Sequence, residues 1–229
     1  MPAKRRDFNQ QISALRKHHG RPAPPQVTEP FEQVLWENVA YLTSDARREE
    51  AYRLLAQSVG TTPQKILAAP AEKLLRVARL GGMRPEDRVE RLRRSADIAL
   101  SEFGGDLDAA LGAPLARAKR ALRKFPGIGE PGAEKILLFA RRFPVLGLES
   151  NGLRVLLRLG YGAEKKSYAA SYRSVQEALE GQLPGDYAGL IAAHQLLRRH
   201  GQEVCRRSDP ECEACPLSGG CEHYARHVE

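Results

Sequence analysis

The stretch FPGIGEPGAEK, residues 125–135, decides the fold, because it joins a glycine-rich turn directly to a helix. Apolar residues recur at helical spacing from Ala133 to Ala140. Pro131 suits the first helical turn, where the N–H that proline lacks has no partner. Backbone N–H groups at such a turn and helix start can hold a phosphate. We therefore expect a phosphate-binding turn here, with an ordinary corner between two helices as the alternative.

Helical patterns dominate the rest of the chain as well. Apolar residues from Phe31 to Leu42 follow the period of one helix face, and another helix is expected over residues 151–159, with Gly160 as its stop. No alternating strand pattern exceeds a few residues, and no repeat of fixed period occurs. The sequence therefore predicts an all-α fold.

Two proline-containing breaks divide the chain. They are HHGRPAPPQVTEP at residues 18–30 and RRFPVLGLES at residues 141–150. We expect one domain over residues 30–143 and a second, discontinuous domain formed by residues 1–29 and 144–229.

The charge of the chain favours an acidic partner. Its 229 residues include 36 Lys and Arg against 28 Asp and Glu, a formal net charge of +8 that suits nucleic acid, although a basic protein without such a partner stays an alternative. An aromatic content of 6% argues against a stacking platform for single strands. The start MPAKRRDFNQQ lacks the apolar stretch of a signal peptide, and no run is long enough to span a membrane. These features predict a cytoplasmic protein.

All four cysteines lie near the end of the chain, at Cys205, Cys212, Cys215 and Cys221. In a reducing compartment such a cluster predicts a metal site before it predicts disulfides, and thiolates suit zinc or an iron–sulfur cluster. The spacings of six, two and five residues differ from the paired Cys-x2-Cys knuckles of a zinc ribbon. Zinc and two disulfides remain the alternatives.

Four stretches together resemble the endonuclease III family of helix-hairpin-helix DNA glycosylases, over nearly the whole chain. They are PFEQVLWENVAYL at 30–42, FPGIGEPGA at 125–133, LESNGLRVLLRLG at 148–160, and HQLLRRHGQEVC at 194–205 running into the cysteines. The resemblance implies a two-domain glycosylase fold, with a six-helix barrel domain at 30–143 and an iron–sulfur cluster domain formed by 1–29 and 144–229. It also implies that the four cysteines bind a [4Fe–4S] cluster.

The implied function is base-excision repair of double-stranded DNA by a nucleoid-associated monomer. Such an enzyme breaks the N-glycosidic bond of a nucleotide rotated out of the stack, and a carboxylate stabilises the charge that develops on the sugar. Glu149 stands where the family carries an aspartate, so we expect it to be catalytic, with its side chain one methylene longer. A structural role at the start of the following helix is the alternative.

Pro131 stands where bifunctional relatives carry the lysine that attacks C1′ and cuts the strand. Proline has no nucleophile, and Lys135 lies about 6 Å further along the helix. We therefore expect a monofunctional glycosylase, in which Lys135 contacts phosphate or carries a surface charge. A bifunctional enzyme using Lys135 and a catalytically silent lesion-binding protein are the alternatives.

Further site residues follow from the same resemblance. Glu37 and Tyr41, four residues apart on the expected helix, are candidates to protonate and stack on the leaving base, and Asn151 to orient water. Met83 is the candidate wedge in the vacated stack, and Leu42 matches a second filler position that is usually polar. An exposed Glu37, a half-buried Tyr41 and a buried Met83 are the structural alternatives.

The hairpin turn and neighbouring cations are expected to hold the DNA backbone, with glycines allowing close approach and positive φ. The candidate contacts are Gly127, Ile128, Gly129, Arg123, Lys124 and Lys135.

Overall fold

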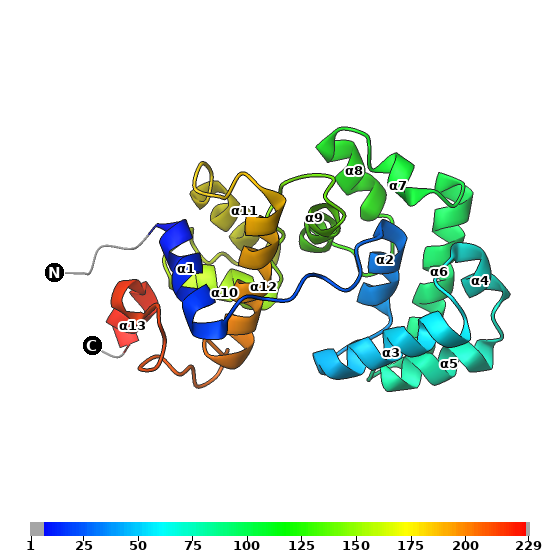
Figure 1. Cartoon of the computed structure of the whole chain (residues 1–229), viewed down its shortest axis with the longest axis horizontal. Coiled ribbons are helices and arrows are strands. Elements are labelled where there is room, and N and C mark those ends of the chain that lie inside the picture. The colour runs from blue at the N-terminus through cyan, green and yellow to red at the C-terminus, as the bar shows by residue number, and fades with distance from the viewer. Residues whose placement is uncertain (1–6, 228–229) are drawn as a thin grey trace. The chain divides into compact units, whose positions relative to one another are not determined.

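The computed structural model describes residues 7–227, and these are helical except for the connecting loops and one isolated bridge between Tyr41 and Gly82 (Figure 1). The all-α prediction is therefore confirmed for the described residues. The chain divides into two compact units. The first combines the segment up to Pro24 with the segment from Pro144, and the second runs from Pro25 to Phe143.

The second unit contains eight helices among the described residues. They are α2 (Pro30–Asn38), α3 (Asp45–Ser58), α4 (Pro63–Ala68), α5 (Ala71–Leu80), α6 (Pro85–Phe103), α7 (Leu107–Ala110), α8 (Leu115–Leu122) and α9 (Glu130–Phe139). Several begin with proline, which is preorganised for a first turn, and α4 adds Thr62 as its N-cap.

The core of the second unit forms around α6 and α2. The helix α6 packs against α2, α4, α5 and α7, while α2 also contacts α3 and α9. Leu35, Leu55, Ile66, Leu74 and Leu92 are fully buried between these helices. Burying each such side chain contributes about 1.5–3 kcal/mol, so the shared core fixes the ends of α2 and α9 that carry candidate site residues.

The first unit joins the two ends of the chain. Its helices are α1 (Phe8–His19), α10 (Ser150–Arg158), α11 (Tyr168–Ala178), α12 (Tyr187–Glu203) and α13 (Glu222–His227), with a 3₁₀ turn at Ser218–Gly220. The long helix α12 packs against both α10 and α1, and Phe8 and Leu15 of α1 are fully buried. A capping box between Asp7 and Gln10 starts α1.

The expected helix from Phe31 to Leu42 is wrong at its C-terminal end. The helix α2 stops at Asn38, although its apolar residues Val34 and Leu35 are buried as the pattern predicted. Leu42 has φ 49° and a 70% exposed side chain, so it lies outside both the helix and the core.

The positions of Tyr41 and Met83 bear on two further expectations. Glu37 and Tyr41 do not share one helix face, since Tyr41 lies in the loop after α2 and is exposed. Met83 is exposed as well, so its alternative role as a buried packing residue is excluded.

None of the helices in the described part of the chain is both long and apolar enough to span a membrane.

Candidate functional site

The turn between α8 and α9 depends on one glycine. Gly127 has φ 73°, a conformation that favours glycine, whereas Gly129 has φ −88° and is an ordinary extended N-cap. The expectation that both glycines supply positive φ is therefore wrong for Gly129. Ile128 is only 5% exposed, so its side chain is not available to a ligand at the turn. Asn38 fixes the turn by donating from Nδ2 to the Pro126 carbonyl at 2.9 Å.

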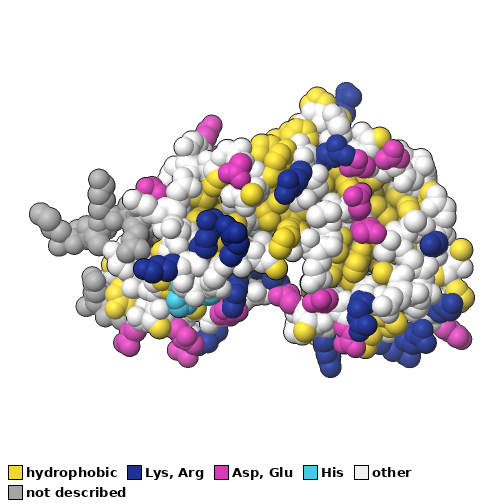
Figure 2. Space-filling view, viewed as in Figure 1, with side chains coloured by type: hydrophobic (Ala, Val, Ile, Leu, Met, Phe, Trp, Pro, Cys, Tyr) yellow, Lys and Arg dark blue, Asp and Glu magenta, His cyan; other side chains and the backbone are white. Residues whose placement is uncertain are grey.

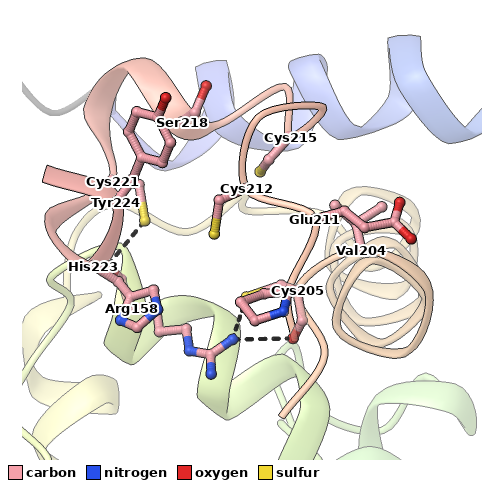
Figure 3. Close-up of a pocket in the computed structure, with 11 residues that line it drawn as sticks. Arg158, Val204, Cys205, Glu211, Cys212, Cys215, Ser218, Cys221, His223 and Tyr224 are labelled. Atoms are coloured by element: carbon pink, nitrogen blue, oxygen red, sulfur yellow. Dashed lines mark hydrogen bonds between the residues drawn. The ribbon is translucent and has the colours of Figure 1, made fainter. Parts of the chain in front are cut away.

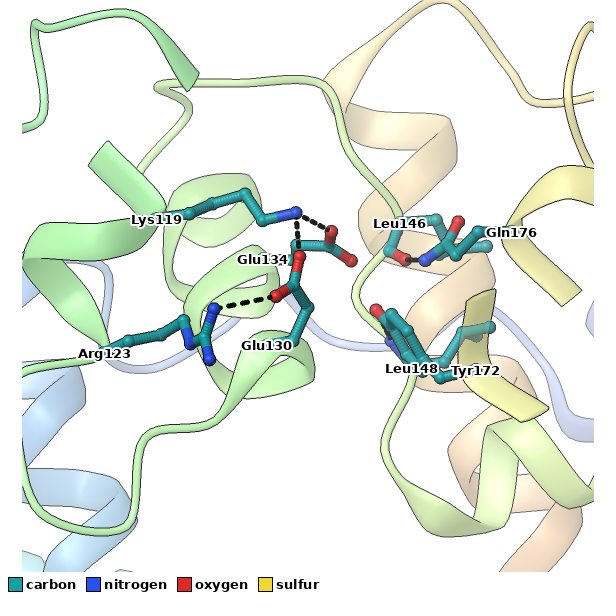
Figure 4. A network of polar contacts seen from close by, with 8 residues as sticks. All are labelled: Lys119, Arg123, Glu130, Glu134, Leu146, Leu148, Tyr172 and Gln176. Atoms are coloured by element: carbon teal, nitrogen blue, oxygen red, sulfur yellow. Dashed lines mark hydrogen bonds and ion pairs between the residues drawn. The ribbon is translucent and has the colours of Figure 1, made fainter. Parts of the chain in front are cut away.

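The cationic side chains around this turn form ion pairs with carboxylates of the same unit (Figure 4). Lys119 of α8 pairs with Glu130 and, at 2.7 Å, with Glu134 of α9, and Arg123 donates to Glu130 at 3.3 Å. Burial alone would lower the pKa of Lys119, but the hydrogen bonds and charges of the two glutamates outweigh it and raise the pKa. Lys124 pairs with Glu102. A phosphate that binds at this turn must therefore compete with these carboxylates.

The same mixing of charge extends over the surface. Figure 2 shows acidic and basic side chains interspersed on one face of the molecule, rather than one continuous basic patch. On this face the positive charge is therefore distributed among acidic side chains and is not gathered in one place.

An ion pair joins α2 to α9. The Lys135 ammonium contacts the Glu37 carboxylate, and the two side chains are only 15% and 26% exposed. Lys135 is thus not the surface charge that the sequence suggested. The Glu37 carboxylate is therefore not an isolated charge, because the Lys135 ammonium contacts it.

Glu149 is the N-cap of α10. Its Oε1 accepts from the Gly152 amide at 2.8 Å, and its Oε2 accepts from the Asn151 side chain at 2.8 Å. The cap role considered from the sequence is therefore present. Because both carboxylate oxygens have fixed donors, the side chain is held in one orientation while staying partly exposed.

The segment before Glu149 is anchored to α11. The Gln176 amide donates to the Leu146 carbonyl at 2.7 Å, and the Leu148 amide donates to the Tyr172 hydroxyl at 3.3 Å (Figure 4). The Tyr168 hydroxyl donates to the Leu148 carbonyl at 3.2 Å. Burial and, to a smaller extent, the charge of Glu149 raise the pKa of Tyr168 to about 12. These contacts limit the movement of the carboxylate.

Arg154 connects the Glu149 cap to the loop that carries the first cysteine. Its Nη2 donates to the Asn151 side chain at 2.8 Å and to the Gly201 carbonyl at 2.6 Å, and its Nε donates to the Cys205 carbonyl at 3.0 Å. Burial, more than any neighbouring charge, lowers the pKa of this guanidinium. Asn151 is therefore fixed between Glu149 and Arg154, which suits a residue that orients another group.

The four cysteines line one pocket in the first unit (Figure 3). None of Cys205, Cys212, Cys215 and Cys221 forms a disulfide, so the disulfide alternative is not realised in this structure. Among residues 7–227, no group of three or more His, Cys, Asp or Glu side chains is placed to hold a single metal ion. Four thiols around one pocket are a soft donor set, which suits zinc or an iron–sulfur cluster.

Neighbouring side chains contact the thiols of this pocket. Arg158 Nη1 lies 3.3 Å from Cys205 Sγ, and His200 Nε2 lies 3.4 Å from Cys215 Sγ. Burial first, and then His19 and His18, lower the pKa of His200 to about 4. Burial raises the pKa of the Cys215 thiol to about 11, so a bound group would have to displace its proton.

Sequence reasoning did not identify Asn38, Glu130 and Arg154. Arg154 lies within the stretch that resembles the family, three residues after Asn151 on the same helix. This i, i+3 spacing could have predicted the contact between their side chains. The contacts of Asn38 with Pro126 join residues 88 positions apart, and no local pattern indicates them.

The chain is similar to known proteins in sequence and in fold. No family model matches it. It is 28% identical over 199 residues to endonuclease III of Thermotoga maritima, covering 87% of this chain and 85% of that protein. A solved structure of endonuclease III trapped as a covalent intermediate with DNA superposes with a TM-score of 0.76 at 20% identity, covering 97% of each chain.

A thermostable thymine-DNA glycosylase superposes with a TM-score of 0.75 at 18% identity, covering 95% of this chain and 98% of that one. The likeness in fold therefore extends over residues of both units. In sequence this chain resembles endonuclease III over most of its length, and its fold is that of the endonuclease III-like helix-hairpin-helix DNA glycosylases.

Proposed function

We propose that this chain is a monofunctional DNA glycosylase that hydrolyses the N-glycosidic bond of a flipped base. The observation that carries this proposal is the carboxylate of Glu149, whose two oxygens have fixed hydrogen-bond donors on a rigid helix start. A fixed carboxylate stabilises an oxocarbenium-like sugar without reorganising during the reaction. Asn151, held by Glu149 and Arg154, is the residue that orients the attacking water.

The chain lacks a free amine where a lyase needs one. Pro131 occupies the second position of α9, and the amine of Lys135 is engaged by Glu37. A Schiff base forms only from a deprotonated amine, so Lys135 would have to lose both its proton and its ion-pair partner. These two features support hydrolysis without strand cleavage.

Glu37 and Lys135 are proposed to act on the departing base together. A carboxylate alone would protonate the base only as a neutral acid, whereas the adjacent ammonium carries protons that it can share. Tyr41, exposed after α2, is proposed to stack on the base.

The proposed partner is double-stranded DNA, bound by a nucleoid-associated monomer. The turn around Gly127, with the neighbouring Arg123 and Lys124, would contact the phosphates. The Lys135 side chain is 15% exposed, so it would not contact a phosphate directly. Its charge would act on the DNA from within the ion pair with Glu37. Leu42 and Met83 would fill the vacated stack.

The proposed cofactor is a [4Fe–4S] cluster held by Cys205, Cys212, Cys215 and Cys221. The four thiols line one pocket and suit a cluster by their softness and number. A bound cluster would link the four cysteines of the segment that follows α12 to one another, and so would hold the loops of that segment together. The chain's own residues supply the chemistry on the sugar.

Single-turnover excision tests the proposed function. Duplexes carrying uracil, thymine mismatches, oxidised pyrimidines, hypoxanthine, alkylated purines or adenine opposite an oxidised guanine are incubated with the protein, and strands are analysed before and after alkali. We expect one lesion class to yield an abasic site that is cut only after alkali. Lesion binding without excision of any base would support the silent binder instead.

A bifunctional glycosylase is the second candidate, because the similar endonuclease III structure is a trapped covalent intermediate with DNA. Borohydride trapping separates the two activities. A covalent adduct of the unmodified protein, lost on Lys135→Ala, would establish the bifunctional enzyme.

A further inference from the structure

A buried histidine lies between α1 and the cysteine pocket. His200 of α12 is 1% exposed, and its Nε2 lies 3.4 Å from the sulfur of Cys215, which lines the pocket (Figure 3). The other ring nitrogen of His200, Nδ1, lies 3.1 Å from Nε2 of His19, the last residue of α1. Both nitrogens of this buried ring therefore have a partner, and the two partners come from segments far apart in the chain.

His19 is itself held in place. Its side chain is 3% exposed, and the Arg199 guanidinium donates from Nη1 to its backbone carbonyl at 3.0 Å. The Glu203 carboxylate, which accepts from Arg199 Nε at 2.9 Å, lies 3.4 Å from Nδ1 of His19. Burial first, and then His18 and Arg199, lower the pKa of His19 despite the charge of Glu203. The ring is therefore neutral and carries one proton.

The acceptor at the pocket decides which ring nitrogens carry the protons. A cysteine sulfur that ligates a metal has lost its proton, so it can only accept a hydrogen bond. Beside such a sulfur, His200 must carry its proton on Nε2, which leaves a lone pair on Nδ1. His19 must then carry its proton on Nε2, facing His200. The two rings thus form two hydrogen bonds in one direction, ending on the Cys215 sulfur.

We infer that His200 donates a hydrogen bond to the Cys215 sulfur of the bound cluster, that His19 fixes its tautomer, and that this bond raises the reduction potential of the cluster. This inference rests on the proposed cofactor and not on excision. Reduction adds negative charge to a cluster and its sulfur ligands, and a donor to sulfur stabilises the more negative state.

The contact from His200 differs from the other contacts of the thiols. Arg158, 3.3 Å from the Cys205 sulfur, also donates to the Arg206 carbonyl at 2.7 Å, so its loss would disturb the loop itself. The Leu217 amide donates to the Cys215 sulfur at 3.4 Å, but it belongs to the backbone. Within the described residues, the His200 side chain bonds only to His19 and Cys215. Its replacement therefore changes the donor to sulfur selectively.

The midpoint potential of the iron-loaded, full-length protein tests this inference. Protein-film voltammetry is run at about pH 8, above the ordinary pKa of histidine, and follows the reversible one-electron couple of the cluster. His200→Leu removes the donor, so we expect it to disfavour the reduced cluster by about tenfold, a shift of about 59 mV to lower potential. His200→Gln keeps an N–H at a similar reach and should retain most of the wild-type potential.

Two variants of α1 complete the series. His19→Leu removes the partner that fixes the tautomer and should disfavour the reduced cluster by about threefold, less than the loss of the donor itself. His18→Ala is the matched control, because the His18 ring is exposed and its centroid lies 6.5 Å from that of His200. This control should leave the potential unchanged.

A magnetic readout separates the hydrogen bond from structural support. Protein containing nitrogen-labelled histidine is brought to a paramagnetic oxidation state of the cluster and studied by pulsed electron paramagnetic resonance. We expect a hyperfine coupling to a histidine nitrogen that persists in His18→Ala and disappears in His200→Leu. His223 lines the same pocket, so a coupling that survives in His200→Leu belongs to that residue.

Other results would overturn the inference. Equal potentials for the wild-type protein and His200→Leu, both with full iron content, would show that the bond does not affect the cluster. Equal shifts in His200→Gln and His200→Leu would assign the effect to packing. If His200→Leu does not retain iron, an unchanged potential in His19→Leu would overturn the inference instead.

The cofactor and the activity are read separately. Wild-type protein that contains zinc and no iron would reject the cluster and this inference together. An iron-loaded protein that shows the expected potentials but excises no base would reject the glycosylase and leave this inference intact.

Discussion

The Lys135 ammonium lies against the Glu37 carboxylate, and this ion pair joins α9 to α2 across 98 positions of the sequence. We expect Lys135→Ala to lower the free energy of unfolding by about 1–3 kcal/mol, because it removes an opposite charge from beside a largely buried carboxylate. Lys135→Arg keeps the charge and is the matched control. Thermal unfolding of both variants and of Glu37→Gln, combined in a double-mutant cycle, measures the coupling. Additive losses would mean that the pair contributes nothing.

Pro131→Lys should give the protein a weak lyase activity. The substitution places an amine at the second position of α9, where the protein now has neither a nucleophile nor an N–H. Pro131→Ala restores the N–H without an amine and should remain purely hydrolytic. Strand cleavage before alkali and a borohydride-trapped adduct are measured for both. An adduct with the alanine variant would place the nucleophile elsewhere.

Glu130→Gln should strengthen binding to every duplex by about two- to fivefold at low salt. Glu130 pairs with Lys119 and Arg123 beside the hairpin turn, so the substitution releases Arg123 for phosphates and leaves Lys119 paired with Glu134 alone. Glu72→Gln removes the same charge from an exposed position of α5 and controls for net charge. Anisotropy titrations over a range of salt concentrations measure the effect. Equal gains from both variants would show that the local pairs do not matter.

Glu149→Gln should reduce excision by about a hundredfold or more while leaving DNA binding unchanged. Glutamine keeps an oxygen that can accept from the Gly152 amide, so the helix cap survives while the negative charge is lost. Glu149→Asp retains both charge and cap, and we expect it to stay active. Glu164→Gln is the control at an exposed position of the same unit. Undiminished single-turnover excision by Glu149→Gln would restrict this residue to a capping role.

Cys212→Ser should remove the proposed cluster and weaken the first unit. The purified wild-type protein should contain about four iron atoms per chain and absorb light at about 400 nm. The variant should lose the iron and the absorbance, and it should unfold at a lower temperature. Ser208→Ala, in the exposed loop between the first two cysteines, controls for a general effect of mutation. Stoichiometric zinc without iron in the purified wild-type protein would contradict the cluster.

Local patterns predicted the helical character of the described chain. The period of apolar residues placed α9 and α10 correctly within one or two residues, because their buried faces satisfy the helical repeat. The same helical period wrongly extended α2 to Leu42, because Leu42 would lie on the apolar face if the helix continued. Only the bridge to the Gly81 loop, 40 residues away, shows that the chain has already left the helix there.

The candidate site was predictable in its residue types and not in its contacts. Glu149 and the cysteines lie in compact motifs, so their positions followed from the sequence. The partner of Glu37 is 98 residues distant, and the partners of Arg123 and Lys119 depend on how α8 turns back on α9. Non-local ion pairs leave no periodic signal, which explains why Lys135 was expected to be an exposed charge.

The packing of α1 against α12 has a consequence for synthesis on the ribosome. Phe8 and Leu15 are buried in the first unit, yet α12 begins only at Tyr187, after the entire second unit. At about 5–20 residues per second, roughly 10–40 s separate the emergence of the two helices. During this interval the second unit can fold alone, while the apolar face of α1 stays exposed and available to chaperones.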